Sequence, residues 1–179
     1  HAENAAKIGI SRSQVKTVTY AFLYGAGDQR IGKAYDKQLP ENEQKKKGSE
    51  IRKAYVAAIP GLKELLEAVQ KASERGFVRG LDGRHISFNS RHVSLNYLLQ
   101  GSAATIAKRW MVLANEHSPE TARQVAFVHD ELQFEVQPEE VDDLKFTLEL
   151  TATMSGEYYK LRIPIAAESK TGHSWADVH

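Results

Sequence analysis

The chain has 179 residues, of which 41% are hydrophobic and 26% charged, and its formal net charge at pH 7 is +1. This length allows one sizeable core or two small coupled subdomains, and the composition is typical of a globular protein. The absence of cysteine excludes disulfides, thiolate catalysis and cysteine-based zinc sites. No apolar stretch approaches the roughly 20 residues of a membrane-spanning helix, so we expect a cytoplasmic protein without a membrane partner.

The first predicted element is a helix over residues 11–25. Ser11 is a typical N-cap, apolar residues follow at helical spacing, and Gly25 ends the pattern. Because a helix advances about 100° per residue, side chains four residues apart lie on one face. Four residues recur at this spacing and form what we call the basic-aromatic stripe: Arg12, Lys16, Tyr20 and Tyr24. Such a stripe can bind a triphosphate and stack on a base, whereas an ordinary surface helix leaves its cations solvated.

Further helices are predicted over residues 28–35, 51–58 and 61–75, so that residues 1–75 are mostly helical. The lysine-rich run 44–47 is expected to be a solvated face. At Gly76 the pattern changes to that of strands and turns.

In the second half of the chain, the apolar periodicity predicts two hairpins, two helices and a strand. In chain order they are a hairpin over 76–88 with an Asp-Gly corner, a long helix over 91–116, a hairpin over 124–136, a helix over 139–158 and a strand over 163–168. The fold class expected from these elements is α+β, with an antiparallel sheet packed on long helices.

The second hairpin carries acids at its reversal, in the tripeptide His129-Asp130-Glu131. Four apolar residues precede the tripeptide, which places its carboxylates at the lip of a buried sheet. A carboxylate in that position is costly unless it is paired or binds a cation, and Mg²⁺ is usually held by one or two carboxylates plus phosphates. The alternative is that Asp130 only favours the turn.

The basic-aromatic stripe and the following glycine resemble the nucleotide-binding helix of the family A (polymerase I type) DNA polymerases, whose motif is Arg-x3-Lys-x3-(Phe/Tyr)-x3-Tyr-Gly. The sequence of this segment is most similar to that of the replicative polymerases of short-tailed phages. The resemblance implies that Arg12 and Lys16 hold the phosphates of the incoming dNTP and neutralise charge on the departing pyrophosphate. Tyr20 would pack on the sugar and base, and Tyr24 with Gly25 would border the templating base.

The tripeptide resembles the second catalytic carboxylate motif of the same family, downstream of the helix motif in the expected order. This implies that Asp130 is a metal ligand for Mg²⁺, with two ions in the complete enzyme. Glu131 would lie beside the metal site with a weaker role, and His129 would contact the primer terminus. Asn96 and Gln100 are implied to bind DNA, because the segment after Gln100 matches the family's Gln-Gly-(Thr/Ser)-Ala-Ala pattern.

Two further segments resemble the phage polymerases, namely Gly80–Arg84 and the terminal run Gly172–His179, which we expect to be the natural end of the protein. By the resemblance, residues 1–75 form the fingers subdomain and residues 76–179 the C-terminal part of the palm. The implied function is template-directed DNA synthesis by a DNA-directed DNA polymerase that transfers a nucleotide from dNTP to the 3′-hydroxyl of a primer annealed to template DNA.

The family's first catalytic aspartate lies in an Asp-Tyr-Ser-type motif upstream of the nucleotide helix, and this chain lacks that motif. The chain also begins at His1 rather than methionine. We therefore expect a fragment that is inactive alone and needs an upstream polymerase segment, carrying the other aspartate, as its partner.

Two other classes of function remain open from the residues. A non-catalytic nucleic-acid-binding module would use the stripe and the lysine run. A metal phosphohydrolase could use His129 and Asp130, but the remaining histidines lack metal-ligand spacing.

Overall fold

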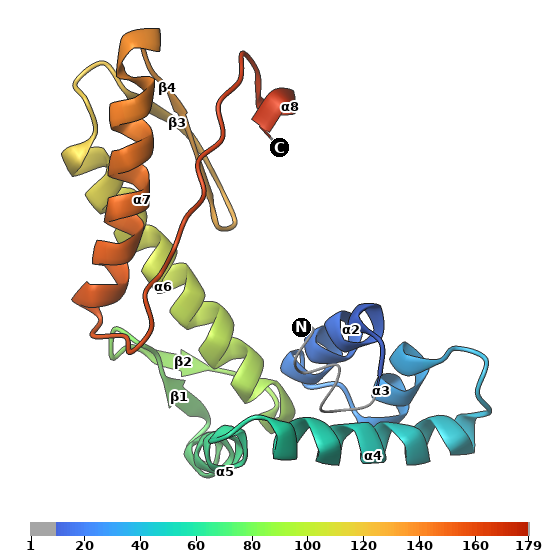
Figure 1. The fold of residues 1–179 in the computed structure, drawn as a ribbon. Helices are drawn as coiled ribbons and strands as arrows, with labels where there is room; N and C mark the ends of the chain where they lie inside the picture. Colours follow the sequence, from blue (N-terminus) through green and yellow to red (C-terminus); the bar gives the residue numbers. More distant parts are fainter. Residues whose placement is uncertain (1–9, 179) are drawn as a thin grey trace. The chain divides into compact units, whose positions relative to one another are not determined.

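The structure is a computed structural model that describes residues 10–178, so His1 and His179 lie outside the described residues. The chain forms two compact units (Figure 1). The first comprises the chain up to Gly80 together with His85–Leu99, and the second comprises Leu81–Arg84 together with the chain from Gln100 onward. The assignment of residues 1–75 to fingers and 76–179 to palm stays a prediction.

The first unit is helical apart from one small hairpin. Its elements are α2 (Arg12–Leu23), α3 (Asp28–Tyr35), α4 (Glu41–Ala58), α5 (Leu62–Ser73), β1 (Phe77–Arg79), β2 (His85–Ser87), η1 (Arg91–Val93) and the beginning of α6 (Ser94–His117). Strands β1 and β2 are antiparallel, with Phe77 opposite Ser87. The predicted helices over 11–25 and 28–35 and the predicted hairpin at the Asp-Gly corner are confirmed.

Helix α2 begins with a capping box that local sequence alone specifies. The Ser11 hydroxyl accepts a hydrogen bond from the Gln14 backbone N–H at 3.2 Å, and the Gln14 side chain accepts one from the Ser11 N–H at 2.9 Å. These two bonds satisfy donors that a helix start otherwise leaves unpaired. The opposite face of the helix is buried through Val15, Val18 and Phe22.

The core of the first unit gathers apolar side chains from all of its helices and from β1. Its buried members are Val18, Phe22, Ala26, Ile31, Ile51, Tyr55, Leu62, Val69, Val78 and Leu95. At the rim of this core Arg52 pairs with Asp28 at 2.5 Å and donates to the carbonyl of Ala26. Helix α4 is thereby tied to the turn that ends α2.

Helices α3 and α4 cross with their main chains in contact. A Cβ on Gly32 would lie 1.8 Å from the Gln44 carbonyl oxygen, and a Cβ on Gly48 would lie 1.7 Å from the Asp28 carbonyl oxygen. No residue with a side chain fits at either position. The two glycines therefore set the separation of the two helices.

The prediction of a helix over residues 51–58 was wrong at its start, because α4 begins ten residues earlier, at Glu41. The charged run is part of this helix, and Lys47 pairs with Glu50 one turn later at 3.6 Å. Lys45 and Lys46 are exposed, as expected of a solvated face. The expectation was wrong for Gln44, which is buried and donates to the Leu39 carbonyl at 2.6 Å. The helix also buries Gln44, Gly48, Ile51 and Tyr55, so packing adds to the small contribution of the exposed Lys47–Glu50 pair.

The second unit is built on two long helices and one hairpin. Its elements are the remainder of α6, β3 (Arg123–Val128), β4 (Glu131–Glu135), η2 (Pro138–Glu140), α7 (Val141–Tyr158) and α8 (Trp175–Val178). The Trp110 indole N–H of α6 donates to the Leu148 carbonyl of α7 at 2.9 Å. The guanidinium of Arg109 lies 3.9 Å from the centre of the Tyr158 ring. These contacts join the two helices side by side (Figure 1).

The predicted strand over residues 163–168 is not formed. This segment instead crosses α7, where the Thr153 hydroxyl donates to the Ile165 carbonyl at 3.1 Å. Gly156 leaves the room for Ile165, since a Cβ there would lie 2.9 Å from its side chain. The α+β class is confirmed. Within residues 10–178 we find no helix with the length and apolar character to cross a membrane.

Candidate functional site

The basic-aromatic stripe lies on the exposed face of α2, in the first unit. Arg12 and Lys16 are exposed, and Tyr20 and Tyr24 retain 50% and 54% of their accessible surface. Neither cation pairs with an acid among residues 10–178. The predicted stripe is therefore present as a solvent-facing row of two cations and two aromatic rings. Its binding role stays a prediction.

Gly25 ends α2 with φ of +71°, a conformation that glycine adopts without strain. A Cβ here would lie 2.3 Å from the carbonyl oxygen of His92. The space that a side chain at this position would need is thus filled by the backbone of His92. Glycine is therefore required at this position for packing, and its place beside the templating base stays a prediction.

Asn96 and Gln100 lie four residues apart on α6, and the division between the two units falls between them. The Asn96 side chain is half-buried and Gln100 is exposed. Positions four apart on a helix share a face, so both amides lie on one side of α6. Their contact with DNA stays a prediction.

The acidic tripeptide lies at the reversal of the β3–β4 hairpin, as predicted. Val128 pairs with Glu131, so His129 and Asp130 form a two-residue turn. His129 has φ of +57°, a left-handed conformation that costs a residue with a side chain about 1–2 kcal/mol. Both turn residues are exposed, and no side chain among residues 10–178 bonds to Asp130.

The expectation that the acids stand at the lip of a buried sheet was wrong. The sheet has only two strands, and Leu132 is the one buried residue within them. Val125, from the apolar run before the turn, is 56% exposed. Apolar residues in this hairpin are therefore not evidence that its acids are desolvated, and the burial argument for a metal does not hold in this unit.

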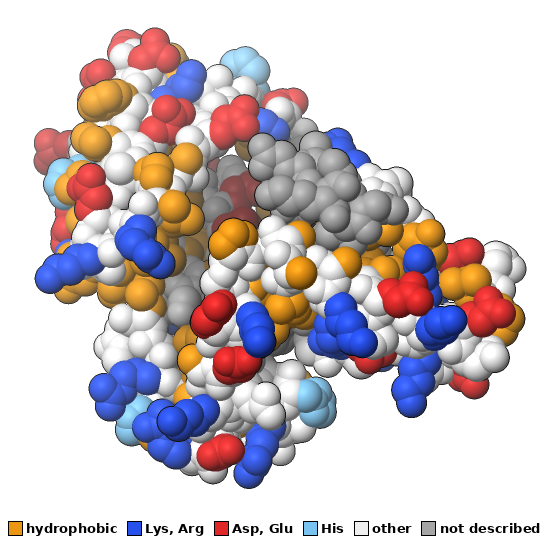
Figure 2. All heavy atoms as spheres, turned by 60° about the horizontal axis from the view of Figure 1, so that its bottom comes forward, with side chains coloured by type: hydrophobic (Ala, Val, Ile, Leu, Met, Phe, Trp, Pro, Cys, Tyr) orange, Lys and Arg blue, Asp and Glu red, His pale blue; other side chains and the backbone are white. Residues whose placement is uncertain are grey.

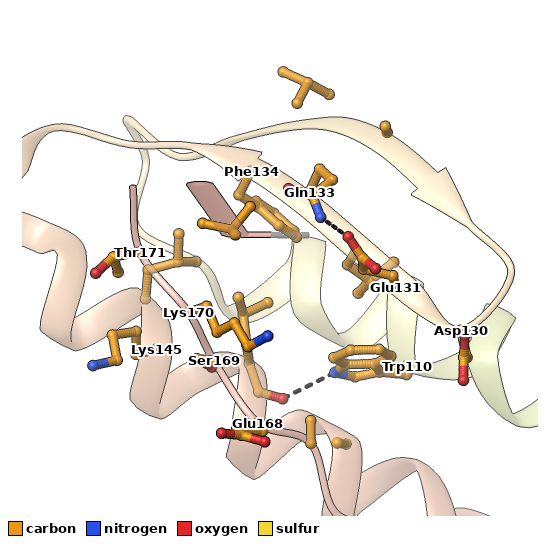
Figure 3. Close-up of a pocket in the computed structure, with 18 of the residues that line it drawn as sticks. Trp110, Asp130, Glu131, Gln133, Phe134, Lys145, Glu168, Ser169, Lys170 and Thr171 are labelled. Carbon is orange, nitrogen blue, oxygen red and sulfur yellow. Dashed lines mark hydrogen bonds between the residues drawn. The ribbon is translucent and has the colours of Figure 1, made fainter. Parts of the chain in front are cut away.

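Glu131 differs from Asp130 in that protein groups hold its carboxylate. The Gln133 side-chain N–H donates to Glu131 Oε1, and the Trp175 indole N–H donates to the same oxygen at 3.4 Å. Figure 3 shows Glu131 turned toward Gln133 along the strand, with Asp130 apart from them at the turn. Sequence reasoning missed the contact with Trp175, because the two residues are 44 positions apart.

A groove of about 1020 Å³ adjoins the acidic turn, within the second unit. Its walls are α6, the hairpin, α7 and the terminal segment from Ile165 to Val178 (Figure 3). Asp130 and Glu131 line it together with basic side chains of Lys145 and Lys170. The groove is thus a mixed apolar and charged site rather than a closed apolar pocket.

One of the residues present fits a magnesium site, and the site stays a prediction. In the described part of the chain there is no group of three or more His, Cys, Asp or Glu side chains that could hold an ion. Mg²⁺ is usually held by one or two carboxylates together with substrate phosphates and water. Asp130, exposed and without a protein partner among residues 10–178, fits as one such carboxylate.

Three other aspartates near the candidate residues in sequence are engaged elsewhere. Asp28 pairs with Arg52, and Asp36 accepts a hydrogen bond from the Gln38 N–H at 2.8 Å. Asp82 pairs with Arg84 at 2.5 Å. Desolvation acts to raise the pKa of Asp82, but hydrogen bonds and the positive charge of Arg84 outweigh it and lower that pKa below its ordinary value.

The face of the molecule drawn in Figure 2 has no broad region of positive charge that could bind anions. On the face drawn in Figure 2, Lys and Arg side chains are interspersed with Asp and Glu, and neither sign covers it. This agrees with a formal net charge of +1. The face in Figure 2 therefore offers no broad region of positive charge that would attract an anion.

Comparison with known proteins identifies the family. A family model described as DNA polymerase family A matches residues 3–177. The chain is 31% identical to the DNA-directed DNA polymerase of Escherichia phage Phieco32, over 100% of this chain and 30% of that protein. It is 29% identical to the DNA-directed DNA polymerase of Escherichia phage T7, over 94% and 27%. It is 30% identical to DNA polymerase I of Bacillus caldotenax, over 93% and 20%.

The chain thus spans less than a third of the length of these relatives. A solved structure, the POL domain of Pol1 from M. smegmatis in complex with DNA primer-template and dNTP, shares its fold. The TM-score is 0.74 at 22% sequence identity, and the match covers 90% of this chain and 31% of that one. The match of the family model over nearly all of the sequence shows that the chain belongs to DNA polymerase family A.

Proposed function

We propose that the chain supplies the nucleotide-binding helix and one catalytic carboxylate of a DNA-directed DNA polymerase. The reaction is attack of a primer 3′-hydroxyl on the α-phosphate of a dNTP, which releases pyrophosphate. The observation that carries the proposal is that one family A chain has both an exposed basic-aromatic stripe and an exposed Asp130 at a hairpin turn. In this proposal the first helices belong to the fingers and the hairpin to the palm.

Each side chain of the stripe has a distinct task. Arg12 presents a planar fork that can bond two phosphate oxygens, and Lys16 presents a compact charge on a flexible stem. Both neutralise charge that develops on the leaving pyrophosphate, which is the main catalytic need of phosphoryl transfer. Tyr20 and Tyr24 stack on the nucleotide and border the templating base.

In the second unit, Asp130 holds the metal and His129 contacts the primer terminus. When bound, two Mg²⁺ ions would polarise the attacking and leaving oxygens. Asn96 and Gln100 donate to minor-groove acceptors, which are nearly the same for all base pairs and so test pair geometry rather than sequence. The relative with a described complex, the M. smegmatis POL domain, binds primer-template and dNTP, which supports these assignments.

The other metal-binding aspartate, which belongs to the family's first carboxylate motif, comes from an upstream polymerase segment. Two observations support this: within residues 10–178 no three-ligand group exists, and Asp28, Asp36 and Asp82 have other partners. The isolated chain is therefore inactive. The polymerase acts in the cytoplasm of the cell in which the DNA is replicated.

Primer extension with and without the missing segment tests the proposal. The segment is the polymerase sequence encoded upstream of this chain or, as a chimera, the corresponding part of the Phieco32 relative. Activity is expected only for the mixture or fusion. Asp130→Asn in the restored enzyme is expected to lower the extension rate about a thousandfold, the effect of several kcal/mol of lost charge stabilisation.

Glu135→Gln, an exposed acid on the same hairpin, is the matched control and should extend normally. Extension that survives Asp130→Asn would remove Asp130 from its role. DNA binding that weakens steeply with salt, together with no Mg²⁺-dependent effect of dNTP in the restored protein, would favour a non-catalytic nucleic-acid-binding module.

A further inference from the structure

The carboxylate of Glu131 receives two donors on one oxygen. Gln133 donates from two residues along β4, and Trp175 donates from the terminal segment at 3.4 Å. A carboxylate held by two donors from different elements has one orientation instead of several. Glu131 therefore links the acidic turn to a part of the chain 44 residues away.

The segment that carries Trp175 has a folded structure of its own. One oxygen of Asp177 accepts hydrogen bonds from the His173 N–H at 3.0 Å and from the Ser174 N–H and hydroxyl at 2.8 and 2.9 Å. Gly172 lets the turn close, since a Cβ there would lie 2.4 Å from Asp177 Cβ. The indole is thus presented from a fastened turn and not from a loose tail.

The same segment is attached to α7 before it reaches the hairpin. The Thr153 hydroxyl donates to the Ile165 carbonyl at 3.1 Å, and the Ser169 N–H donates to Glu149 at 3.3 Å. Residues 165–178 therefore connect α7 to the acidic turn (Figure 1). The hairpin that this segment reaches buries only Leu132, so few packed side chains hold it in place.

We propose that Trp175 is a positioning residue for the acidic turn. Through its bond to Glu131 it fixes the start of β4, and so holds the neighbouring Asp130 directed away from the strand. Glu131 then serves to orient the turn through Oε1, the oxygen that receives both protein donors. The catalytic meaning of this proposal rests on the proposed function, but the contact itself does not.

Indole resonances test the contact in the full chain. The sequence has two tryptophans, so ¹⁵N-indole labelling gives two cross-peaks, assigned with Trp110→Phe and Trp175→Phe. Glu131→Gln is expected to move the Trp175 cross-peak and leave that of Trp110, which bonds to Leu148, in place. Glu135→Gln is the matched control and should move neither. An unmoved Trp175 peak in Glu131→Gln would overturn the proposal.

Amide exchange tests the positioning effect. Trp175→Phe keeps the ring and removes the donor, and Asp177→Asn loosens the turn that presents it. Both are expected to raise the exchange of β4 amides about fivefold, as loss of one net hydrogen bond does. Amides of α2, in the other unit, should be unaffected. Unchanged β4 exchange in both variants contradicts the proposal, even if one of them is poorly folded.

Kinetics of the restored enzyme separate this inference from the proposed function. Trp175→Phe is expected to lower kcat about fivefold and leave the KM for dNTP unchanged, and the double variant with Glu131→Gln should be no worse than the worse single variant. If the restored wild type does not extend primers, the proposed function fails and the indole result still stands. If it extends primers and Trp175→Phe matches it, the positioning role fails alone.

Discussion

In the first unit the basic-aromatic stripe stands on α2, whose opposite face buries Val15, Val18 and Phe22. In the second unit the acidic turn stands on a hairpin in which only Leu132 is buried. The stripe is therefore held by a packed core and a capping box, whereas the turn is held by a few specific bonds from distant residues. A substitution that leaves the core intact should spare the geometry of the stripe, while a single lost hydrogen bond can disturb the turn.

The largest expected effect breaks the packing of the first unit. Gly48→Ala places a Cβ against the Asp28 carbonyl and is expected to cost about 3 kcal/mol in free energy of unfolding. Urea unfolding followed by circular dichroism measures it. Gly27→Ala is the control, because nothing lies within 4 Å of a Cβ there. Equal losses in both variants would mean that the close crossing of α3 and α4 does not carry the stability of this unit.

The next largest effect is on nucleotide binding, with no change in the stability of the fold. Lys16→Ala removes an exposed cation and is expected to weaken dNTP binding by the restored enzyme about thirtyfold, or about 2 kcal/mol, with the unfolding midpoint unchanged. Lys46→Ala, an exposed lysine on α4, should change neither quantity. A lower unfolding midpoint for Lys16→Ala would show that the Lys16 side chain contributes to the packing of the first unit and is not only a surface cation.

A smaller effect concerns the turn. His129→Gly relieves a left-handed conformation and is expected to stabilise the hairpin by about 0.5–1 kcal/mol, after the entropic cost of glycine. Amide exchange of β3 and β4 reports it. The same change should lower primer extension by the restored enzyme, because the proposed primer contact is lost. Destabilisation would mean that the His129 side chain supports the fold instead.

The smallest effect is one of pH on the terminal segment. Hydrogen bonds from the Ser174 hydroxyl, its N–H and the His173 N–H lower the pKa of Asp177 below its ordinary value. A carboxyl whose pKa is lowered by folding stabilises the fold above its unfolded-state pKa and loses that contribution as pH falls through the folded-state pKa. The Ser174 amide should therefore broaden or shift on acidification, and Asp177→Asn should abolish this response. An identical response in the variant would exclude Asp177 as its origin.

The same contrast explains what could be predicted from the sequence. Helix α2 and helix α3 follow local rules, because a cap, an apolar spacing and a terminating glycine lie within a few residues of one another. The start of α4 is joined to α3, where the Gln29 side chain donates to Glu41 at 2.7 Å, and the segment 163–168 lies on α7 instead of pairing as a strand. Both are decided by residues distant in the chain, which periodicity does not reveal.

At the candidate site the division is similar. The stripe and the position of Asp130 at a reversal could be predicted, since each depends on spacing along one element. The exposure of the hairpin could not, because an apolar run looks the same whether or not another element covers it. The partners of Glu131 and the closing of Gly25 by His92 are tertiary contacts, and no local signal announces them.

The main-chain contact of α3 with α4 has a mechanical consequence. With no side chain between the two backbones at Gly32 and Gly48, there is no compressible layer that would let one helix shift while the other stays. Arg52 extends the linkage to the end of α2. A load applied to the surface of any one of these three helices is therefore transmitted to the other two, and the basic-aromatic stripe moves together with them.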